Sequence, residues 1–475
     1  MATANNDDNT TSSRDNGEKL QIWEYPTSES ADYRKYGVLY EESSDNDDQW
    51  NKIQPSSIDK ASDVPKEQSP MMEAMTKEVL SFFLPAQYPK SVAPGYARFA
   101  AYSFTASVAG SAAMVLSTQT LLLAVGVVGS NVQHAGIMAG AFNWVMKDFV
   151  GQLGGVLFAS QMGKTRAFDT DPKRWRMVAA MVLDGATLLE ILSPLFPSSM
   201  VLPVASFANV GKNIGFLTAS ASRASLHQAI AITGNLGDVT AKAGSQSIMA
   251  SLIGTSLGIG MSSLLSHDTY NFALGFCFLG LVHQGCNFLS LQSVPLTYFN
   301  RQRLHILLER YMEDSTIMNP MDVAKKESYF PLYSVDADTK SWLSIGAEPL
   351  ESLCPTPMTL REALSAQTTW TVKEGEHESN PQYLIRAMPD GHVHLMFFQT
   401  STGDDMIRGM YHACILRKKF VTSASPESNN DSKKAQSETE FKALLEQIHL
   451  QGWKTETEIT TLEHGDSRRL VWKED

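Results

Sequence analysis

The sequence predicts a mainly α-helical protein, in which a polytopic helical membrane domain of about six spans is followed by a small α+β C-terminal domain. Charge distribution carries this prediction. Residues 81–300 hold only 11 Lys and Arg and 7 Asp and Glu, and four stretches lack all four residue types: 99–146, 191–211, 243–267 and 269–300. Each is about as long as a bilayer span, because a helix needs about 20 apolar residues to cross roughly 30 Å of hydrocarbon.

Whole-chain averages hide this pattern. The net charge of −12 and the mean hydropathy of −0.16 are typical of an acidic soluble protein, and they indicate no nucleic-acid partner. Residues 1–80 account for much of the charge, with 8 Lys and Arg against 17 Asp and Glu. The four cysteines form no CxxC pair, so neither a disulfide framework nor a zinc site is expected. We expect no cofactor, and no metal.

The N-terminal part, residues 1–70, is predicted to be a disordered acidic arm, because its Asp, Asn, Ser and Glu leave little apolar surface to bury. Short strands at 22–25 and 36–40 are the expected exceptions. The first twenty residues have neither the apolar core of a signal peptide nor the Arg-rich character of a transit peptide. We therefore expect a multi-pass protein of an intracellular membrane, with the organelle open.

The domain at 71–300 begins with a helix at 71–83 and a Pro-punctuated segment, LPAQYPKSVAPGY, at 84–96. The six spans are expected at about 99–127, 133–162, 177–197, 199–222, 245–266 and 270–296. Small residues dominate them, as in GQLGG at 151–155 and GTSLGIG at 254–260. Such runs allow helix backbones to approach closely inside a membrane.

Lysines and arginines supply an independent test of this topology. They precede the first span, lie in the connections between spans two and three and between spans four and five, and follow the sixth span, whereas the other connections have none. This is the pattern of a chain with both termini on the cytoplasmic side. The alternative is a soluble helical domain, but a soluble helix normally has a charged outer face, and 99–146 has no charge.

From residue 301 to 475 the composition is that of a soluble, cytoplasmic α+β domain. The strands predicted at 382–388 and 393–399 are expected to form a β-hairpin, whose turn contains Pro389, Asp390 and Gly391. A polar linker is expected near 423–437. The predicted helices are 301–312, 321–328, 404–417 and 438–450, and the predicted strands are 382–388, 393–399, 453–460 and 468–472.

The middle of the chain resembles the root UV-B sensitive (RUS) family. The matching segments, in order, are LPAQYPKSVAPGY (84–96), LSTQTLLLAVGV (116–127), WVMKDFVGQLGGVLFAS (144–160), DTDPKRWR (169–176), LLEILSPLFP (188–197), ANVGKNIG (208–215) and ASRASLHQAIAITGNLGDVTAKAGSQ (221–246). The resemblance implies a membrane-associated protein linked to light signalling, auxin transport and vitamin cofactor homeostasis, without an established catalytic activity. It also suggests another RUS-family protein as a partner, in a homo- or hetero-oligomer.

Charged residues inside predicted spans are the first candidates for function, because an ionisable group in hydrocarbon is costly unless it is paired or faces water. The set is Lys147, Asp148, Asp184, Glu190 and Lys212. They are read as a polar path between helices, and the alternative is a structural network of ion pairs. Asp184 and Glu190 are six residues apart, which places them on different helix faces.

The second candidate is a polar loop at 221–246 between two apolar spans. Its polar groups are candidates for binding an anionic small molecule or lipid headgroup, and ordinary interfacial anchoring is the alternative. The candidate binding residues are Arg223, His227, Asn235, Asp238 and Lys242.

These observations predict a non-enzymatic membrane protein in contact with lipid. It is expected to be transporter-like or a membrane component of light and UV-B signalling and small-molecule homeostasis. A membrane-associated adaptor whose C-terminal domain recruits a partner is the first alternative. A soluble cofactor-handling enzyme is the second.

Overall fold

The computed structural model describes residues 20–24, 36–42, 50–53, 78, 81–124, 134–162, 167–265, 269–329, 342–371, 382–421, 430–456, 460, 462 and 468–471. The chain divides into two units, Met1–Ala74 and Met75–Asp475. In the first unit, β1 (Leu20–Glu24), β2 (Tyr36–Glu42) and β3 (Trp50–Ile53) form an antiparallel sheet in the order β1-β2-β3. Both strands expected within the acidic arm are present, and β3 is an addition.

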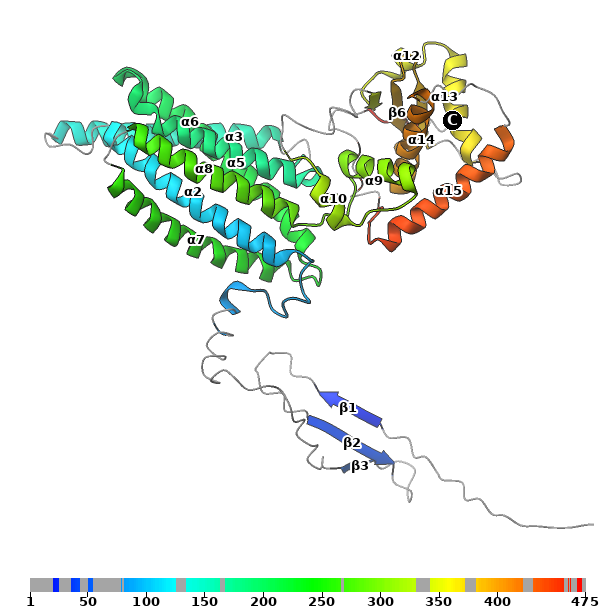
Figure 1. Cartoon of the computed structure of the whole chain (residues 1–475), viewed down its shortest axis with the longest axis horizontal. Coiled ribbons are helices and arrows are strands. Elements are labelled where there is room, and N and C mark those ends of the chain that lie inside the picture. Colours follow the sequence, from blue (N-terminus) through cyan, green and yellow to red (C-terminus); the bar gives the residue numbers. More distant parts are fainter. Residues whose placement is uncertain are drawn as a thin grey trace, which may run out of the picture. The chain divides into compact units, whose positions relative to one another are not determined.

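The second unit begins with a bundle of long helices (Figure 1). Each of the six predicted spans corresponds to one of them, although most ends shift by several residues. The helices are α2 (Tyr96–Ala124), α3 (His134–Met162), α5 (Pro172–Ile191), α6 (Ser198–Ile230), α7 (Leu236–Leu264) and α8 (Thr269–Gln292), with the short α4 (Ala167–Thr170) and the 3-10 turn η1 (Ser193–Leu195) between them.

Close helix packing in this bundle depends on small residues, as the sequence predicts. Helix α2 packs against α7 and α8, and α6 packs against α3 and α5. A Cβ atom at Gly254 of α7 would overlap with the carbonyl oxygen of Val108 in α2, and one at Gly258 would lie 2.8 Å from the carbonyl oxygen of Ala112. The backbones of α2 and α7 therefore meet directly, which only glycine permits at these positions.

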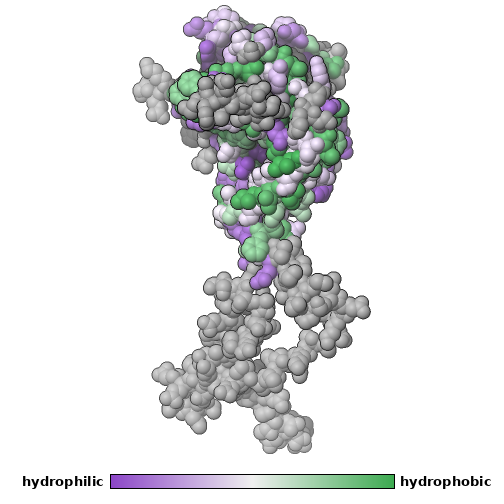
Figure 2. All heavy atoms as spheres, turned by 90° about the vertical axis from the view of Figure 1, so that its left-hand side faces the viewer, coloured by the Kyte–Doolittle hydropathy of each residue, from purple (hydrophilic) through white to green (hydrophobic). Residues whose placement is uncertain are grey.

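The outer faces of the bundle carry large apolar side chains. Those on α3, α7 and α8 that are more than half exposed and recur at helical spacing include Phe142, Phe149, Val156, Ile248, Leu252, Ile259, Leu274, Phe278 and Leu281. Figure 2 shows hydrophobic side chains exposed beside polar ones on the face in view. Monomeric soluble proteins rarely expose contiguous apolar surface of this kind.

Four described helices are long and apolar enough to cross a membrane by length and composition: α2, α6, α7 and α8. Helices α3 and α5 are not in this set, and α5 carries five charged residues. The mainly helical fold is therefore confirmed, whereas the number of six membrane spans stays a prediction.

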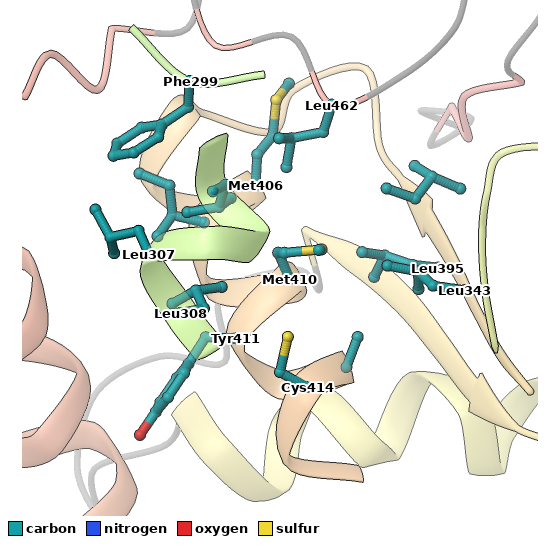
Figure 3. Close-up of a cluster of buried hydrophobic side chains, with 14 of the residues drawn as sticks. Phe299, Leu307, Leu308, Leu343, Leu395, Met406, Met410, Tyr411, Cys414 and Leu462 are labelled. Carbon is teal, nitrogen blue, oxygen red and sulfur yellow. The ribbon is translucent and has the colours of Figure 1, made fainter. Parts of the chain in front are cut away.

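The C-terminal α+β region contains α9 (Arg301–Asp314), α10 (Pro320–Lys326), β4 (Leu343–Ile345), α12 (Leu350–Leu353), α13 (Pro357–Thr371), β5 (Tyr383–Ala387), β6 (Val393–Phe397), α14 (Gly403–Val421) and α15 (Asn430–Leu450). The predicted hairpin is present as the antiparallel pair β5–β6, and β4 pairs parallel to β6. Apolar side chains of α9, α14, α15 and the sheet form one core (Figure 3).

Two expectations for this region differ from the structure. Helix α15 begins at Asn430, so the second half of the predicted linker is helical, consistent with its Lys, Ala, Gln and Glu residues. Residues 423–429 of the linker lie outside the described part. The predicted strands near 453–460 and 468–472 are reduced to single bridges, Tyr298 to Lys454 and Phe398 to Leu470, among the described residues.

A buried ion-pair triad joins the start of α5 to α9 and the end of α10. Glu327 Oε2 lies 2.5 Å from Lys173 Nζ, and Glu327 Oε1 lies 2.5 Å from Arg303 Nε. All three side chains are at most 2% exposed. Burial alone would raise the pKa of Glu327, but the two cations outweigh it and hold this pKa below its usual value. Asp171, at the N-cap of α5, has its pKa raised to about 6 by burial.

Replacing Glu327 should destabilise the protein more than any exposed ion-pair substitution. Glu327→Gln leaves two buried cations without their shared anion, and breaking a buried pair in this way costs about 3–5 kcal/mol. Glu313→Gln is the matched control, since its 3.7 Å pair with Arg310 is exposed and worth at most about 1 kcal/mol. Denaturant midpoints of the purified full-length variants check this. Equal midpoints would contradict a structural role for the triad.

The buried imidazole of His412 in α14 should make the C-terminal domain acid-sensitive. His412 is 2% exposed, and burial followed by the charge of Lys419 lowers its pKa to about 3. The folded state therefore binds fewer protons than the unfolded state, and stability falls as the pH drops from 6.5 towards 3, by about 2 kcal/mol at pH 5. Hydrogen exchange of α14 amides at pH 7.5 and 5 should show this loss, and His412→Gln should reduce it. A His412→Gln variant with the same pH dependence as the native protein would contradict this role of His412.

Candidate functional site

Four of the five charged residues of the predicted polar path meet inside the bundle. Lys212 of α6 forms an ion pair with Glu190 at the end of α5, and the hydroxyl of Ser117 in α2 also donates to this carboxylate. Lys212 Nζ further donates to Ser117 Oγ at 3.1 Å. Lys147 of α3 lies 3.5 Å from the other carboxylate oxygen of Glu190. One buried carboxylate thus faces two ammonium groups and a hydroxyl.

Asp148 completes this cluster at its outer edge. Its carboxylate lies 3.3 Å from Lys147 Nζ and accepts a 3.2 Å hydrogen bond from Asn209 Nδ2, while its side chain is 42% exposed. Gly151 makes room for Asn209, because a Cβ there would collide with the amide. Two positive and two negative charges make the cluster neutral, which is the arrangement an apolar surrounding requires.

Asp184 lies apart from this cluster, as its position on a different face of α5 predicts. Its carboxylate faces His283 Nδ1 at 2.9 Å and accepts a 2.6 Å hydrogen bond from Gln284 Nε2, both from α8. The carboxylate of Asp184 thus contacts Gln284, which is uncharged, and His283, which is charged only when it is protonated. Asp184 and His283 both line a cavity, described below.

The prediction of a polar loop at 221–246 is wrong, because most of these residues are helical. Helix α6 continues to Ile230 and α7 starts at Leu236, so only five residues connect them. The sequence reading ended the helix too early because Arg223, His227 and Gln228 are polar. In an amphipathic helix end they face a cavity or solvent without breaking the helix.

The five candidate residues of that segment therefore separate. Asp238 accepts a 2.7 Å hydrogen bond from the amide of Ala86, and Lys242 donates to the carbonyl of Ser81 at 2.6 Å, so both hold the segment that precedes α2. Asn235 is the N-cap position of α7, although its side chain makes no capping bond. His227 faces Thr240 across the α6–α7 connection, with 3.2 Å between Nδ1 and Oγ1. Arg223 alone reaches the main cavity.

This main cavity has a volume of about 570 Å³ and lies between α2, α5, α6, α7 and α8. Its wall combines apolar groups such as Leu183 and Phe216 with polar ones, which include Ser107, Thr118, Arg176, Asp184, Arg223, Ser251 and His283. A small neighbouring cavity of about 60 Å³ is lined by His227, Gln246, Asn287 and the arginines Arg176 and Arg223. A site of this size and mixed lining suits a small organic molecule.

Sequence reasoning missed several residues of this site. His283 and Gln284 were not among the candidates because only Asp, Glu, Lys and Arg inside the predicted spans were considered. The available signal was a polar His-Gln pair within an apolar run. Arg176 was assigned to a basic connection and instead lies in α5, where Nη1 donates to the carbonyl of Ala219 at 3.0 Å. No local signal connects Lys173 to Glu327, 154 residues away. The described residues contain no group of His, Cys, Asp and Glu that could hold a metal ion.

Fold and site together define a class of protein: a helical bundle with apolar outer faces, paired charges inside and a polar cavity between its helices. The chain belongs to the root UVB sensitive family. Residues 70–315 match the family model described as the vitamin B6 photo-protection and homoeostasis domain, and residues 318–464 match the model described as root UVB sensitive protein, C-terminal.

Individual relatives agree with this assignment. The chain is 30% identical over 383 residues to Protein root UVB sensitive 3 of Arabidopsis thaliana, which covers 80% of this chain and 83% of the relative. It is 25% identical over 407 residues to Protein root UVB sensitive 2, chloroplastic, of the same plant, covering 85% and 87%. RUS family member 1 of Dictyostelium discoideum is 29% identical over 249 residues, covering 52% and 46%. No solved structure matches the chain.

Glu190 should be the most sensitive member of the buried cluster. Glu190→Gln leaves Lys147 and Lys212 with only the half-exposed Asp148 to balance them, at a cost of about 3–5 kcal/mol. Asp148→Asn should cost about 1 kcal/mol or less, because solvent screens its pair. Thermal unfolding in detergent, followed by intrinsic fluorescence, compares the two. A larger loss for Asp148→Asn would contradict the assigned geometry.

Proposed function

We propose that this chain is an integral membrane protein that carries a small polar solute through the cavity between its helices. The observation that carries the proposal is the distribution of polarity. Large apolar side chains point outward from α3, α7 and α8, while the ion pairs and the 570 Å³ cavity lie inside. A bilayer favours this arrangement, because lipid covers the apolar faces and charged groups must be paired or face water.

In this proposal all six long helices cross the membrane, with lipid as their surroundings and both termini on the cytoplasmic side. Helices α3 and α5 cross despite their charges, because Lys147 and Asp148 of α3 and Glu190 of α5 belong to one ion-pair cluster with Lys212 of α6. Their neutral total reduces the desolvation penalty that separate charges would carry. The protein acts without a catalytic step in this account.

The description of the matched family domain suggests the first solutes to try. Vitamin B6 compounds are small, polar and aromatic, and they suit a mixed cavity of this volume. Asp184 is the residue assigned to solute contact, because it lines the cavity and its carboxylate is held in place by His283 and Gln284. The cluster around Glu190 has a structural role.

Membrane insertion is tested on the native protein with tags at both termini. The protein should stay in the membrane pellet after carbonate extraction, and both tags should be digested only when protease has access to the cytoplasmic face. Release by carbonate would remove the membrane and transport proposals together. Tags on opposite faces would contradict six spans.

Transport is tested in proteoliposomes with radiolabelled pyridoxine and pyridoxine 5′-phosphate. Uptake of at least one should exceed that of protein-free liposomes, and Asp184→Asn should reduce it about tenfold while thermal stability is retained. Asp148→Asn is the matched control, since this carboxylate does not line the cavity. Uptake equal to that of empty liposomes for both compounds would overturn the carrier proposal for this solute class.

A further inference from the structure

Two arginines of the bundle, the half-buried Arg176 and the exposed Arg223, differ from its buried lysines in having no anionic partner. Lys147 and Lys212 pair with Glu190, and Lys173 pairs with Glu327. Arg176 and Arg223, by contrast, form no ion pair with any carboxylate in the described part of the chain. Arg176 makes one hydrogen bond, to the carbonyl of Ala219, which leaves most of its five N–H donors free.

The same two arginines line one space. Both line the main cavity and the small neighbouring one, so they stand where the two join. Two like charges at one site repel each other, and an anion bound at this site would be attracted by both.

Neutral hydrogen-bond donors surround this position. The hydroxyl groups of Ser107 and Ser247 line both cavities with the two arginines, and neither makes a hydrogen bond to another described residue. In a helix, a serine hydroxyl commonly bonds the carbonyl four residues earlier, as Ser256 does to Leu252. The free hydroxyls of Ser107 and Ser247 are thus available to a ligand.

We propose that Arg176 and Arg223 bind the phosphate group of a phosphate monoester. The charge of such a group, about −1.5 to −2 at pH 7, matches two guanidinium groups better than a single carboxylate does. Its three terminal oxygens also accept several donors at once, in the geometry that the guanidinium fork provides. The inference rests on the proposed function, since it takes this cavity to be the solute site.

A third charged residue of the cavity wall limits the rest of the ligand. Asp184 brings a carboxylate to this wall, paired with His283. A second anionic group would be repelled by it, whereas a neutral or cationic polar group would be accepted. The ligand therefore carries, besides its phosphate, a small uncharged or cationic group.

A phosphate in this position has two sources, a soluble metabolite or the headgroup of a lipid. Arg223 is an exposed residue, so the site opens to the surroundings of the bundle. Full-length protein in phosphatidylcholine nanodiscs is therefore titrated with phenyl phosphate, with phenol as the probe that lacks phosphate. A parallel series uses nanodiscs that contain phosphatidic acid, whose headgroup is itself a phosphate monoester.

Phenyl phosphate should bind in phosphatidylcholine nanodiscs, phenol should not, and Arg176→Gln or Arg223→Gln should weaken binding about tenfold or more. Arg176→Lys should restore part of the affinity, because the charge is retained. Arg98→Gln is the matched control, since Arg98 is an exposed arginine of α2 that lines neither cavity. Inorganic phosphate should compete with phenyl phosphate.

Each outcome has one meaning. Arginine-dependent binding that phosphatidic acid leaves unchanged assigns the site to a soluble phosphate monoester, and binding abolished by phosphatidic acid assigns it to a lipid headgroup. Equal binding by the native protein and both glutamine variants, or none in either series, overturns the inference. Pyridoxine uptake that persists in that case leaves the carrier proposal intact, so the two failures can be separated.

Discussion

Charge pairing inside an apolar bundle holds the helices of this protein together. A carboxylate or an ammonium group removed from water is strongly destabilising unless an opposite charge and hydrogen bonds replace the lost hydration. Glu190 meets this requirement with Lys147, Lys212 and Ser117, and so ties four helices together. Glu327 does the same for Lys173 and Arg303 and ties α5 to the C-terminal region.

Three charged residues that lack this pairing line the cavity. Arg176, Arg223 and Asp184 are the charged residues of its wall, and none of them has a partner of full opposite charge from a Lys, Arg, Asp or Glu side chain in the described chain. Pairing of the other charges makes the bundle stable, whereas these three leave charge available for a ligand. The proposed function therefore assigns structural and binding roles to two different sets of charged residues.

Much of the architecture was predictable from the sequence. Gaps in charge, together with Gly and Pro punctuation, located all six long helices, because apolar composition and helix length are local properties. The β5–β6 hairpin followed from its turn residues, with Gly391 at a φ of +82°, a conformation that favours glycine. The difference in face between Asp184 and Glu190 followed from helical geometry. Helix ends were less predictable, as at Ile230 and Asn430, because polar residues can continue a helix as well as end it.

Partners distant in the sequence were not predictable. Nothing near Lys173 indicates Glu327, and nothing near Asp184 indicates His283, since both contacts arise only when the helices pack. Arg176 and Arg223 were visible as cations, but their lack of carboxylate partners is a property of the folded chain. The sequence therefore predicts which residues are unusual in an apolar region, and packing decides which of them are available to a ligand.

Spin labels at Ile248, Leu252 and Ile259, on the outer face of α7, test whether lipid covers the apolar faces of the bundle. Each label is placed on a single cysteine in a variant whose native cysteines are replaced, and the protein is reconstituted in liposomes. A lipid-covered face should show relaxation by oxygen, which dissolves in hydrocarbon, and little relaxation by a water-soluble nickel complex. Strong relaxation by the nickel complex at all three positions would place this face in water and contradict a membrane-spanning bundle.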